Sequence, residues 1–449
     1  MKYYLLTILI LICLAFFFYN HYDIFFYFAI LSFLMITIMP FVKKLKNNNL
    51  DLFEISFIFV CGYLFIYFLG TIAMYIFLKE TFQIDNTSKI IINKMIILYI
   101  IGIIFYYFGY HFKINFKIIR FIKYIIKIPY IFNESKLFYI SILFYLIGLN
   151  VFLFSIFKFG FSYFLEYSYI RSIIFQNSNY LFFLIQFSIP SFLIIFSIYL
   201  KKKYILFLPI LLLIILIFIN FLLGGRFRTV SILIMLISIY YYLQRKSIFK
   251  KIIFLFISIF LIFISISIIR YFNSIYLIKN NIKDIVLSNL DYPFYFYKII
   301  INIPFNISYQ YGKTFVTFLF YPLPRALFPQ KPLSAGSFIT QYLFPYLKYS
   351  SVPPTILGEL YLNFSYFGIM IGMFIIGILH KIIYEYFNLN KEKLSYIIFY
   401  SIIIPFVFWC NFLDFTLTLV YLFYLLIPFL LIIFISRDVV NEKNKNIIS

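Results

Sequence analysis

Residues 413–436 read LDFTLTLVYLFYLLIPFLLIIFIS, a run in which Asp414 is the only charged side chain. A transmembrane helix needs about 20 mainly apolar residues to cross roughly 30 Å of hydrocarbon, and this run is long enough. In lipid, only helices and closed barrels satisfy their own backbone hydrogen bonds, and a barrel strand would alternate polar with apolar residues. The run therefore predicts a transmembrane helix.

Similar runs recur along the 449 residues, of which 64% are hydrophobic, and the mean hydropathy is +1.01. They predict an all-α polytopic integral membrane protein with about 12 transmembrane helices, folded as a single polytopic membrane domain over residues 1–449. The predicted spans are 4–20, 24–42, 55–78, 90–112, 137–158, 180–200, 204–223, 229–243, 252–269, 356–379, 395–410 and 413–436.

The chain carries a formal net charge of +23, and the distribution of this charge predicts the topology. If the N-terminus is cytoplasmic, Lys and Arg concentrate in the short loops on the inner side, such as 113–136 and 245–251, as the positive-inside rule requires. We therefore expect a multi-pass protein with both termini in the cytoplasm. Attraction to anionic membrane lipids fits the same charge, so no nucleic-acid partner is needed to explain it.

The segment between the ninth and tenth predicted spans, residues 270–355, forms one large loop that faces outward in this topology. Loops longer than about 60 residues escape the orientation rule, and long loops without a fold of their own are usually functional. Aromatic-rich pieces at 291–303 and 313–320 predict helices that lie in the membrane interface. We expect this loop to cover a site at the outer membrane surface.

Two arginines on the predicted outer side stand in unusual surroundings. Arg325 lies in YPLPRALFPQKP, residues 321–332, and Arg226 follows two glycines in GGRFR, residues 224–228. A guanidinium binds phosphate through two parallel hydrogen bonds, while proline and glycine hold the backbone in conformations that position such a side chain. The pattern predicts a site for an anion of high charge density, such as a diphosphate. Alternatively, these arginines reach lipid headgroups.

Three motifs in this order resemble a known family. They are GGR at 224–226, PRALFPQKP at 324–332 and GELYLNFSYFG at 358–368. The combination is similar to bacterial oligosaccharide repeat-unit polymerases, the Wzy-type O-antigen and capsule polymerases, over residues 137–380.

The resemblance implies a class C glycosyltransferase-like fold with one large periplasmic loop in the bacterial inner membrane. It implies a membrane glycosyltransferase that moves the growing glycan from undecaprenyl diphosphate to a new undecaprenyl-diphosphate-linked repeat unit, with no metal or other cofactor. It assigns the handling of the diphosphate to Arg226 and Arg325, and to Arg171 in EYSYIRS, residues 166–172. It also implies a chain-length regulator as a partner.

Four further residues are candidates for the site. Lys331 would help to neutralise the diphosphate beside Arg325. Glu359 opens a span, where an ionised side chain is costly and hence a functional candidate, and it would take the proton of the acceptor hydroxyl. Alternatively, Glu359 pairs with an arginine as a structural salt bridge. Tyr361 and Asn363 would hydrogen-bond sugar hydroxyls, although helix packing is the alternative for Tyr361.

Two other functions remain open at this point. An O-antigen ligase would share the architecture but is expected to carry a histidine in the large outer loop, and residues 270–355 contain none. A lipid-linked oligosaccharide flippase or other transporter should show an internal repeat and ionisable residues at the midplane, and neither is evident. The three cysteines and three histidines have no metal-ligand spacing.

Overall fold

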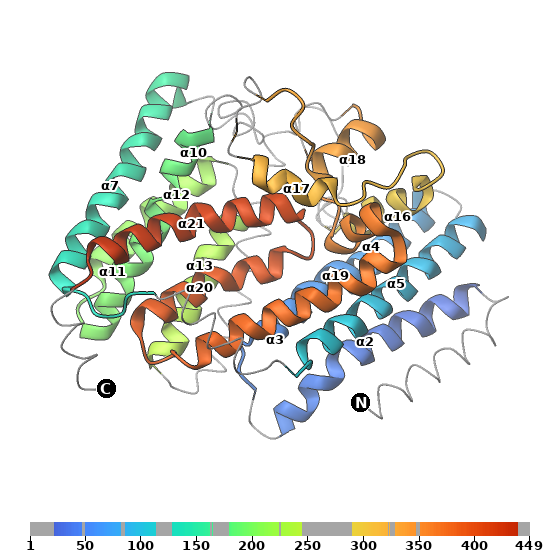
Figure 1. Ribbon diagram of the computed structural model, residues 1–449, viewed down its shortest axis with the longest axis horizontal. Coiled ribbons are helices and arrows are strands. Elements are labelled where there is room, and N and C mark those ends of the chain that lie inside the picture. The colour runs from blue at the N-terminus through green and yellow to red at the C-terminus, as the bar shows by residue number, and fades with distance from the viewer. Residues whose placement is uncertain are drawn as a thin grey trace. The chain divides into compact units, whose positions relative to one another are not determined.

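The structure is a computed structural model, shown in Figure 1, that describes residues 22–46, 50–81, 86–113, 128–161, 164, 179–223, 226–244, 290–321, 323, 328–346 and 351–438. Within these ranges the regular elements are helices. Eight of the described helices are long and apolar enough to cross a membrane, and two shorter ones, Phe207–Leu222 and Leu394–Trp409, are also apolar.

These ten segments fall on ten of the twelve predicted spans and confirm the all-helical, polytopic prediction. The other two predicted spans, 4–20 and 252–269, lie outside the described residues. The spanning elements are α2 (Tyr22–Lys46), α3 (Ile55–Tyr63) with the π-helical segment Leu64–Leu69 and α4 (Gly70–Thr81), α5 (Asn86–Tyr110), α7 (Glu134–Phe159), α10 (Asn179–Ile185) with α11 (Ser188–Lys202), α12 (Phe207–Leu222), α13 (Arg226–Gln244), α19 (Ile356–Asn388), α20 (Leu394–Trp409) and α21 (Phe415–Ile435).

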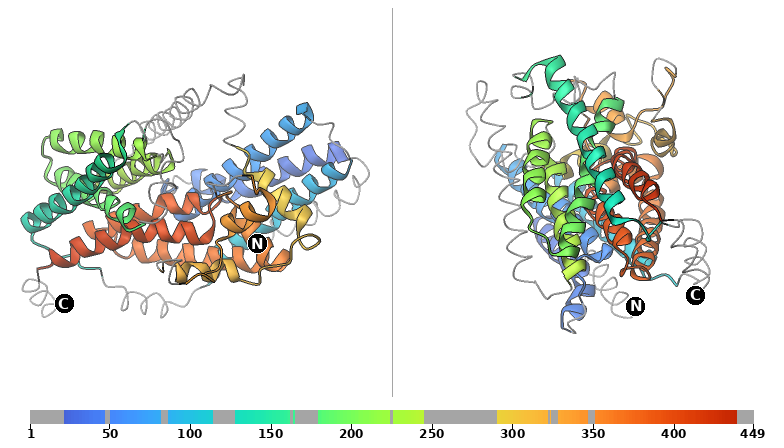
Figure 2. Two further views of the ribbon diagram at one scale, coloured as in Figure 1. Left: turned by 90° about the horizontal axis from the view of Figure 1, so that it is seen from above. Right: turned by 90° about the vertical axis from the view of Figure 1, so that its left-hand side faces the viewer.

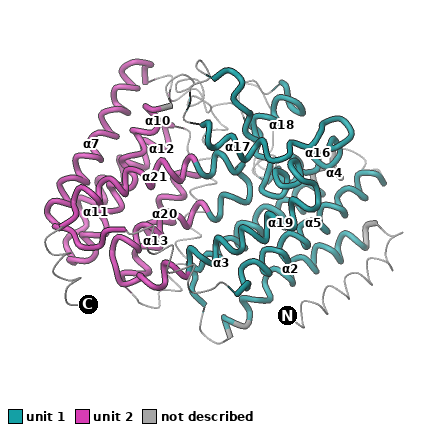
Figure 3. The backbone as a smooth tube through the Cα atoms, in the orientation of Figure 1, with its two compact units in different colours: residues 1–114, 281–384, 407–419 teal, residues 115–280, 385–406, 420–449 magenta. Residues whose placement is uncertain are grey.

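The chain divides into two compact units, drawn in different colours in Figure 3. Unit 1 comprises Met1–Ile114, Asn281–Tyr384 and Val407–Leu419, and unit 2 comprises Asn115–Asn280, Glu385–Phe406 and Val420–Ser449. Each unit is therefore built from chain segments that are far apart in the sequence.

In unit 1, α2 and α5 pack side by side, as Figure 2 also shows. Small residues allow α5 and α19 to approach closely, because a Cβ added at Gly109 would meet the backbone of Phe374, and one added at Gly377 would meet the carbonyl oxygen of Tyr106. Close backbone approach at glycines is typical of helices that associate in lipid.

The predicted span 356–379 is not one continuous helix. Phe364 and Ser365 have non-helical backbone angles and divide α19 into segments 356–363 and 366–388. A Cβ at Gly368 would overlap the carbonyl oxygen of Leu360, and one at Gly372 would overlap the Leu360 side chain. The first segment therefore turns back onto the second. Gly368, at the end of GELYLNFSYFG, and Gly372, one turn later, provide the space.

The loop that is predicted to face outward, called the outer loop below, contains the short helices that the sequence predicts. They are α16 (Tyr292–Asn302) and α17 (Lys313–Phe320), and a third, α18 (Ala335–Leu343), follows them. α16 packs against α4 and α5 of unit 1, so this part of the loop is folded onto the helices.

Unit 2 has its own core of buried residues around Phe152, Phe182 and Ile219. α7 packs along α11. The Nζ atoms of Lys201 and Lys202 each lie 2.9 Å from a carboxylate oxygen of Glu134, which joins the end of α11 to the start of α7.

Candidate functional site

Hydrogen bonds and ring stacking join the residues on the two sides of Arg325. Lys331 donates hydrogen bonds from Nζ to the carbonyl oxygens of Tyr321 (2.8 Å) and Leu323 (3.2 Å), and it lies 4.9 Å from the centre of the Tyr321 ring. The rings of Phe320 and Phe328 stack at 5.4 Å with an interplanar angle of 9°. Arg325 itself lies outside the described residues, but its two flanks are bound to each other. The role of Lys331 in neutralising a diphosphate stays a prediction.

The N-terminal end of α17 is bound to the first segment of α19. Asn363 accepts a hydrogen bond at Oδ1 from the backbone N–H of Gly312 (2.8 Å) and donates one from Nδ2 to Oγ1 of Thr314 (2.8 Å). The same Thr314 hydroxyl donates to Oε1 of Glu359 (2.8 Å). Glu359 and Asn363 lie one helical turn apart, so both side chains reach α17 from one face. The motif GELYLNFSYFG thus binds the start of the helix that leads to Arg325.

Glu359 also contacts the beginning of α21. Its Oε2 accepts a hydrogen bond of 2.7 Å from the backbone N–H of Phe415, and the residue is 2% exposed. Glu359 makes no ion pair with any residue that the structure describes. Its two oxygens are bound by a hydroxyl and an amide, which are both neutral donors.

A second buried carboxylate, Asp414, holds the other side of the Arg325 segment. Its Oδ2 accepts a hydrogen bond of 3.1 Å from the backbone N–H of Gly336 in α18. Its Oδ1 accepts one of 2.7 Å from the N–H of Leu417, which caps the N-terminus of α21. Asp414 is 1% exposed. The sequence indicates Asp414 as a secondary candidate for the base near the predicted outer end of the last span, but nothing in the pattern identifies Gly336 as its partner.

Additional bonds complete the frame around the segment. The Thr317 hydroxyl donates to the carbonyl oxygen of Leu333 (3.0 Å), and the Thr416 hydroxyl donates to that of Thr314 (3.1 Å). α17 is therefore bound to the residues that lead into α18 and to the starts of α19 and α21.

Tyr361 and Asn363, which the sequence suggests as sugar ligands, are both buried. The ring of Tyr361 lies 5.7 Å from that of Tyr366 and 6.3 Å from that of Phe296. These contacts are those of a packed aromatic cluster, and the polar atoms of Asn363 bind α17. Sugar binding by either residue stays a prediction.

The remaining predicted diphosphate ligands fall mainly outside the described residues. Arg226 begins α13 but its side chain is not described, and Arg171 lies outside the described ranges. The neighbouring Arg228 is buried in unit 2. It donates a hydrogen bond from Nη2 to the carbonyl oxygen of Leu223 (3.1 Å), and its guanidinium lies 4.7 Å from the centre of the Phe182 ring. Within the described ranges, no group of three or more His, Cys, Asp or Glu residues is placed to hold a metal ion.

Together, these features define a polytopic helical membrane protein with an arginine-bearing, proline-rich loop segment fastened to the ends of its helices. The family model described as "Putative O-antigen polymerase" matches residues 51–424, and the chain belongs to this family of O-antigen polymerases. No curated protein and no solved structure matches the chain.

Proposed function

We propose that the protein polymerises undecaprenyl-diphosphate-linked oligosaccharide repeat units at the periplasmic face of the bacterial inner membrane. It would act as a glycosyltransferase with both termini in the cytoplasm and would work with a chain-length regulator. Family membership supports the polymerase role. The observation that carries the proposal further is that hydrogen bonds and ring stacking join the two flanks of Arg325, because an arginine whose flanks are joined suits the binding of a diphosphate.

In the proposed reaction, the oxygen of an acceptor sugar hydroxyl attacks the anomeric carbon of the donor glycan. The bond between that carbon and the phosphate oxygen breaks, its electron pair stays on the leaving lipid diphosphate, and the hydroxyl proton passes to a base. Negative charge therefore grows on the diphosphate in the transition state. Guanidinium groups that are already in place stabilise this charge, and losing one such donor typically lowers the rate by about 10²–10³.

In this scheme, Arg325, Arg226 and Arg171 bind the diphosphate. Lys331 holds the base of the Arg325 segment through the carbonyl oxygens that it binds. The catalytic role predicted for Glu359, as the base, would require one of its oxygens to leave a present hydrogen-bond donor and face the acceptor.

The test is the substitution Arg325→Lys, which keeps the charge but removes the planar fork. It would be placed in a strain that lacks the chromosomal copy, and the surface glycan would be separated by gel electrophoresis. Single-unit glycans without longer polymer, at normal protein level, are expected. The matched control is Arg437→Lys, the same exchange at the predicted cytoplasmic end of the last span, which should leave the ladder unchanged.

The deletion strain separates the other functions. A strain without the protein should still display single repeat units on its surface. If it displays neither polymer nor single units, a ligase or flippase is the better assignment. If polymer persists, the polymerase proposal is wrong.

A further inference from the structure

We infer that Glu359, Asn363 and Asp414 are positioning residues, which fix α17 and α18 and thereby set the place of the Arg325 segment between them. This inference rests on the proposed function, because it assigns these residues to the diphosphate-binding segment. It differs from the expectation that Glu359 takes the acceptor proton.

The three side chains bind residues on both sides of the Arg325 segment. Their partners in the outer loop are the N–H of Gly312, the hydroxyl of Thr314 and the N–H of Gly336. Gly312 and Thr314 belong to the start of α17, before the Arg325 segment, and Gly336 belongs to the start of α18, after it. The three side chains therefore hold both ends of the segment.

Glu359 and Asp414 each join the outer loop to the start of α21. A buried carboxylate is strongly unfavourable unless hydrogen bonds satisfy it, and both Glu359 and Asp414 are buried. Each uses one oxygen for the outer loop and the other for a backbone N–H at the start of α21. A carboxylate offers two acceptor oxygens on one rigid plane, so a single side chain can join the two elements. This geometry explains why acidic residues stand at these two buried positions.

The surroundings of Glu359 do not suit a general base. A general base must lie within hydrogen-bond reach of the proton that it removes. Both oxygens of Glu359 already accept hydrogen bonds, and the residue is 2% exposed. Its geometry therefore fits the holding of α17 better than contact with a sugar hydroxyl.

The two roles give opposite results for Glu359→Gln. A glutamine oxygen can accept from the N–H of Phe415, and its amide can donate to the Thr314 hydroxyl, which both donates and accepts. If Glu359 positions the loop, this variant should keep polymerisation within about tenfold of the native protein, whereas Glu359→Ala should lose about a hundredfold, as expected for a small misplacement of a reactive group. If Glu359 is the base, both variants should be inactive.

A second pair of variants tests the same contact from the loop side. Thr314→Ser keeps the hydroxyl that binds Glu359 and Asn363, and Thr314→Val removes it at similar volume. Positioning predicts polymer with Thr314→Ser and little polymer with Thr314→Val. This pair remains informative where Glu359→Ala fails to fold.

The decisive readout does not depend on activity. A nitroxide attached at Gln330→Cys, an exposed position in the described part of the segment, reports local motion by electron paramagnetic resonance, after Cys13, Cys61 and Cys410 are replaced by Ser. Glu359→Ala and Thr314→Val should increase the motion of the nitroxide and so narrow its spectral lines. Glu359→Gln should leave the lines nearly as broad as in the native protein. The control Glu134→Ala, which breaks two partly exposed ion pairs in unit 2, should not change the spectrum.

The outcomes separate the inference from the proposed function. A spectrum that reports increased motion in Glu359→Ala, together with a native level of polymer, would support positioning. The same result would overturn the role of the Arg325 segment in polymerisation. A native spectrum in Glu359→Ala would overturn positioning. Loss of polymer in Glu359→Gln with a native spectrum would identify Glu359 as the base. This result would also overturn the positioning role.

Discussion

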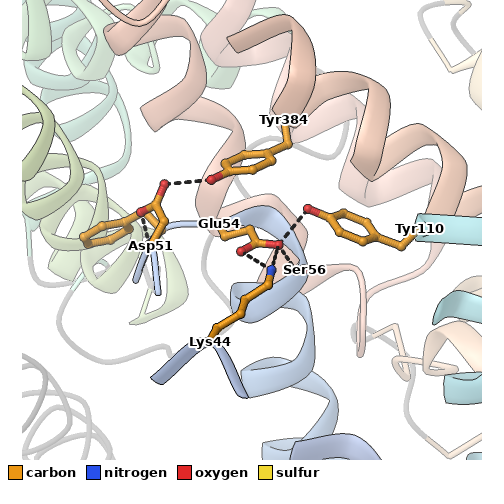
Figure 4. Close-up of polar contacts among 7 residues, drawn as sticks. Lys44, Asp51, Glu54, Ser56, Tyr110 and Tyr384 are labelled. Carbon is orange, nitrogen blue, oxygen red and sulfur yellow. Dashed lines mark hydrogen bonds and ion pairs between the residues drawn. The ribbon is translucent and has the colours of Figure 1, made fainter. Parts of the chain in front are cut away.

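A polar cluster at the predicted cytoplasmic end of unit 1 provides a test of stability away from the candidate site. Glu54 is buried, and both its oxygens accept hydrogen bonds of 2.6 Å from Nζ of Lys44. Its Oε1 also accepts from the hydroxyls of Ser56 (2.6 Å) and Tyr110 (2.9 Å), as Figure 4 shows. These partners join α2, the start of α3 and the end of α5. We expect Lys44→Met to destabilise this end of the bundle.

The magnitude follows from the burial of the two partners. Removing one partner of a buried ion pair typically costs about 3–5 kcal/mol, because the other charge is left without compensation. The side chain of Glu54 is 5% exposed but that of Lys44 is 34% exposed, so water screens part of the loss. We therefore expect Lys44→Met to lower the free energy of unfolding by about 2–3 kcal/mol.

The assay is the thermal midpoint, Tm, of the purified protein in detergent, measured from the fraction that remains monodisperse. The matched control is Lys201→Met, because Lys201 pairs with Glu134 while their side chains are 53% and 33% exposed. An exposed pair contributes about 0–1 kcal/mol, so the control should hardly change Tm. Adding Glu54→Gln to Lys44→Met should recover part of the loss, since a neutral amide needs no cation. Equal Tm shifts for Lys44→Met and Lys201→Met, or a double variant whose Tm shift equals the sum of the two single shifts, would show that Lys44 and Glu54 do not form a stabilising buried pair.

Two further predictions concern unit 1. Gly372→Ala should destabilise the turned-back segment of α19 by about 1–3 kcal/mol through overpacking, and this cost should be smaller in a Leu360→Ala background, because the new Cβ would overlap the Leu360 side chain. The cost of Gly368→Ala should be the same in the Leu360→Ala background, because its Cβ would meet the Leu360 carbonyl oxygen, which that variant keeps; an equal reduction of both costs, measured by Tm, would contradict the described turn. Asp291, which accepts a hydrogen bond of 2.8 Å from Tyr295 at the start of α16, has its pKa raised from 3.8 to about 6 by burial. Because the folded state binds this proton more tightly than the unfolded state, stability is greatest at low pH and falls as the pH rises through about 6. Asp291→Asn should therefore gain Tm relative to the native protein between about pH 4 and pH 7, and a constant difference would contradict the shift.

The helical spans could be predicted from the sequence because hydropathy reports the cost of placing each residue in lipid. The break in α19 could not, since Phe364 and Ser365 lie within an apolar stretch and hydropathy carries no information about backbone angles. The glycines at 368 and 372 were visible in the sequence, but their partner, Leu360, becomes a neighbour only after the chain has turned.

For the site, the sequence could select Glu359 because an acid at a membrane edge is rare. The sequence could not indicate what Glu359 binds, because the partner hydroxyl on Thr314 lies 45 positions earlier in the chain. The same holds for Asp414 and Gly336, which are 78 positions apart. Sequence patterns report local periodicity and composition, whereas these contacts depend on how the outer loop folds back onto the helices.

The two ends of unit 1 use carboxylates in different ways, and the difference bears on the proposed chemistry. Glu54 is bound by a lysine, so its charge and that of its partner largely cancel. Glu359 and Asp414 are bound by hydroxyl and amide donors among the described residues. An arginine paired with either carboxylate would lose much of its attraction for a diphosphate, because the two charges would already be neutralised. Anchors that use neutral donors fix the loop without pairing with its arginines, which leaves the positive charge of those arginines for the proposed binding of a diphosphate.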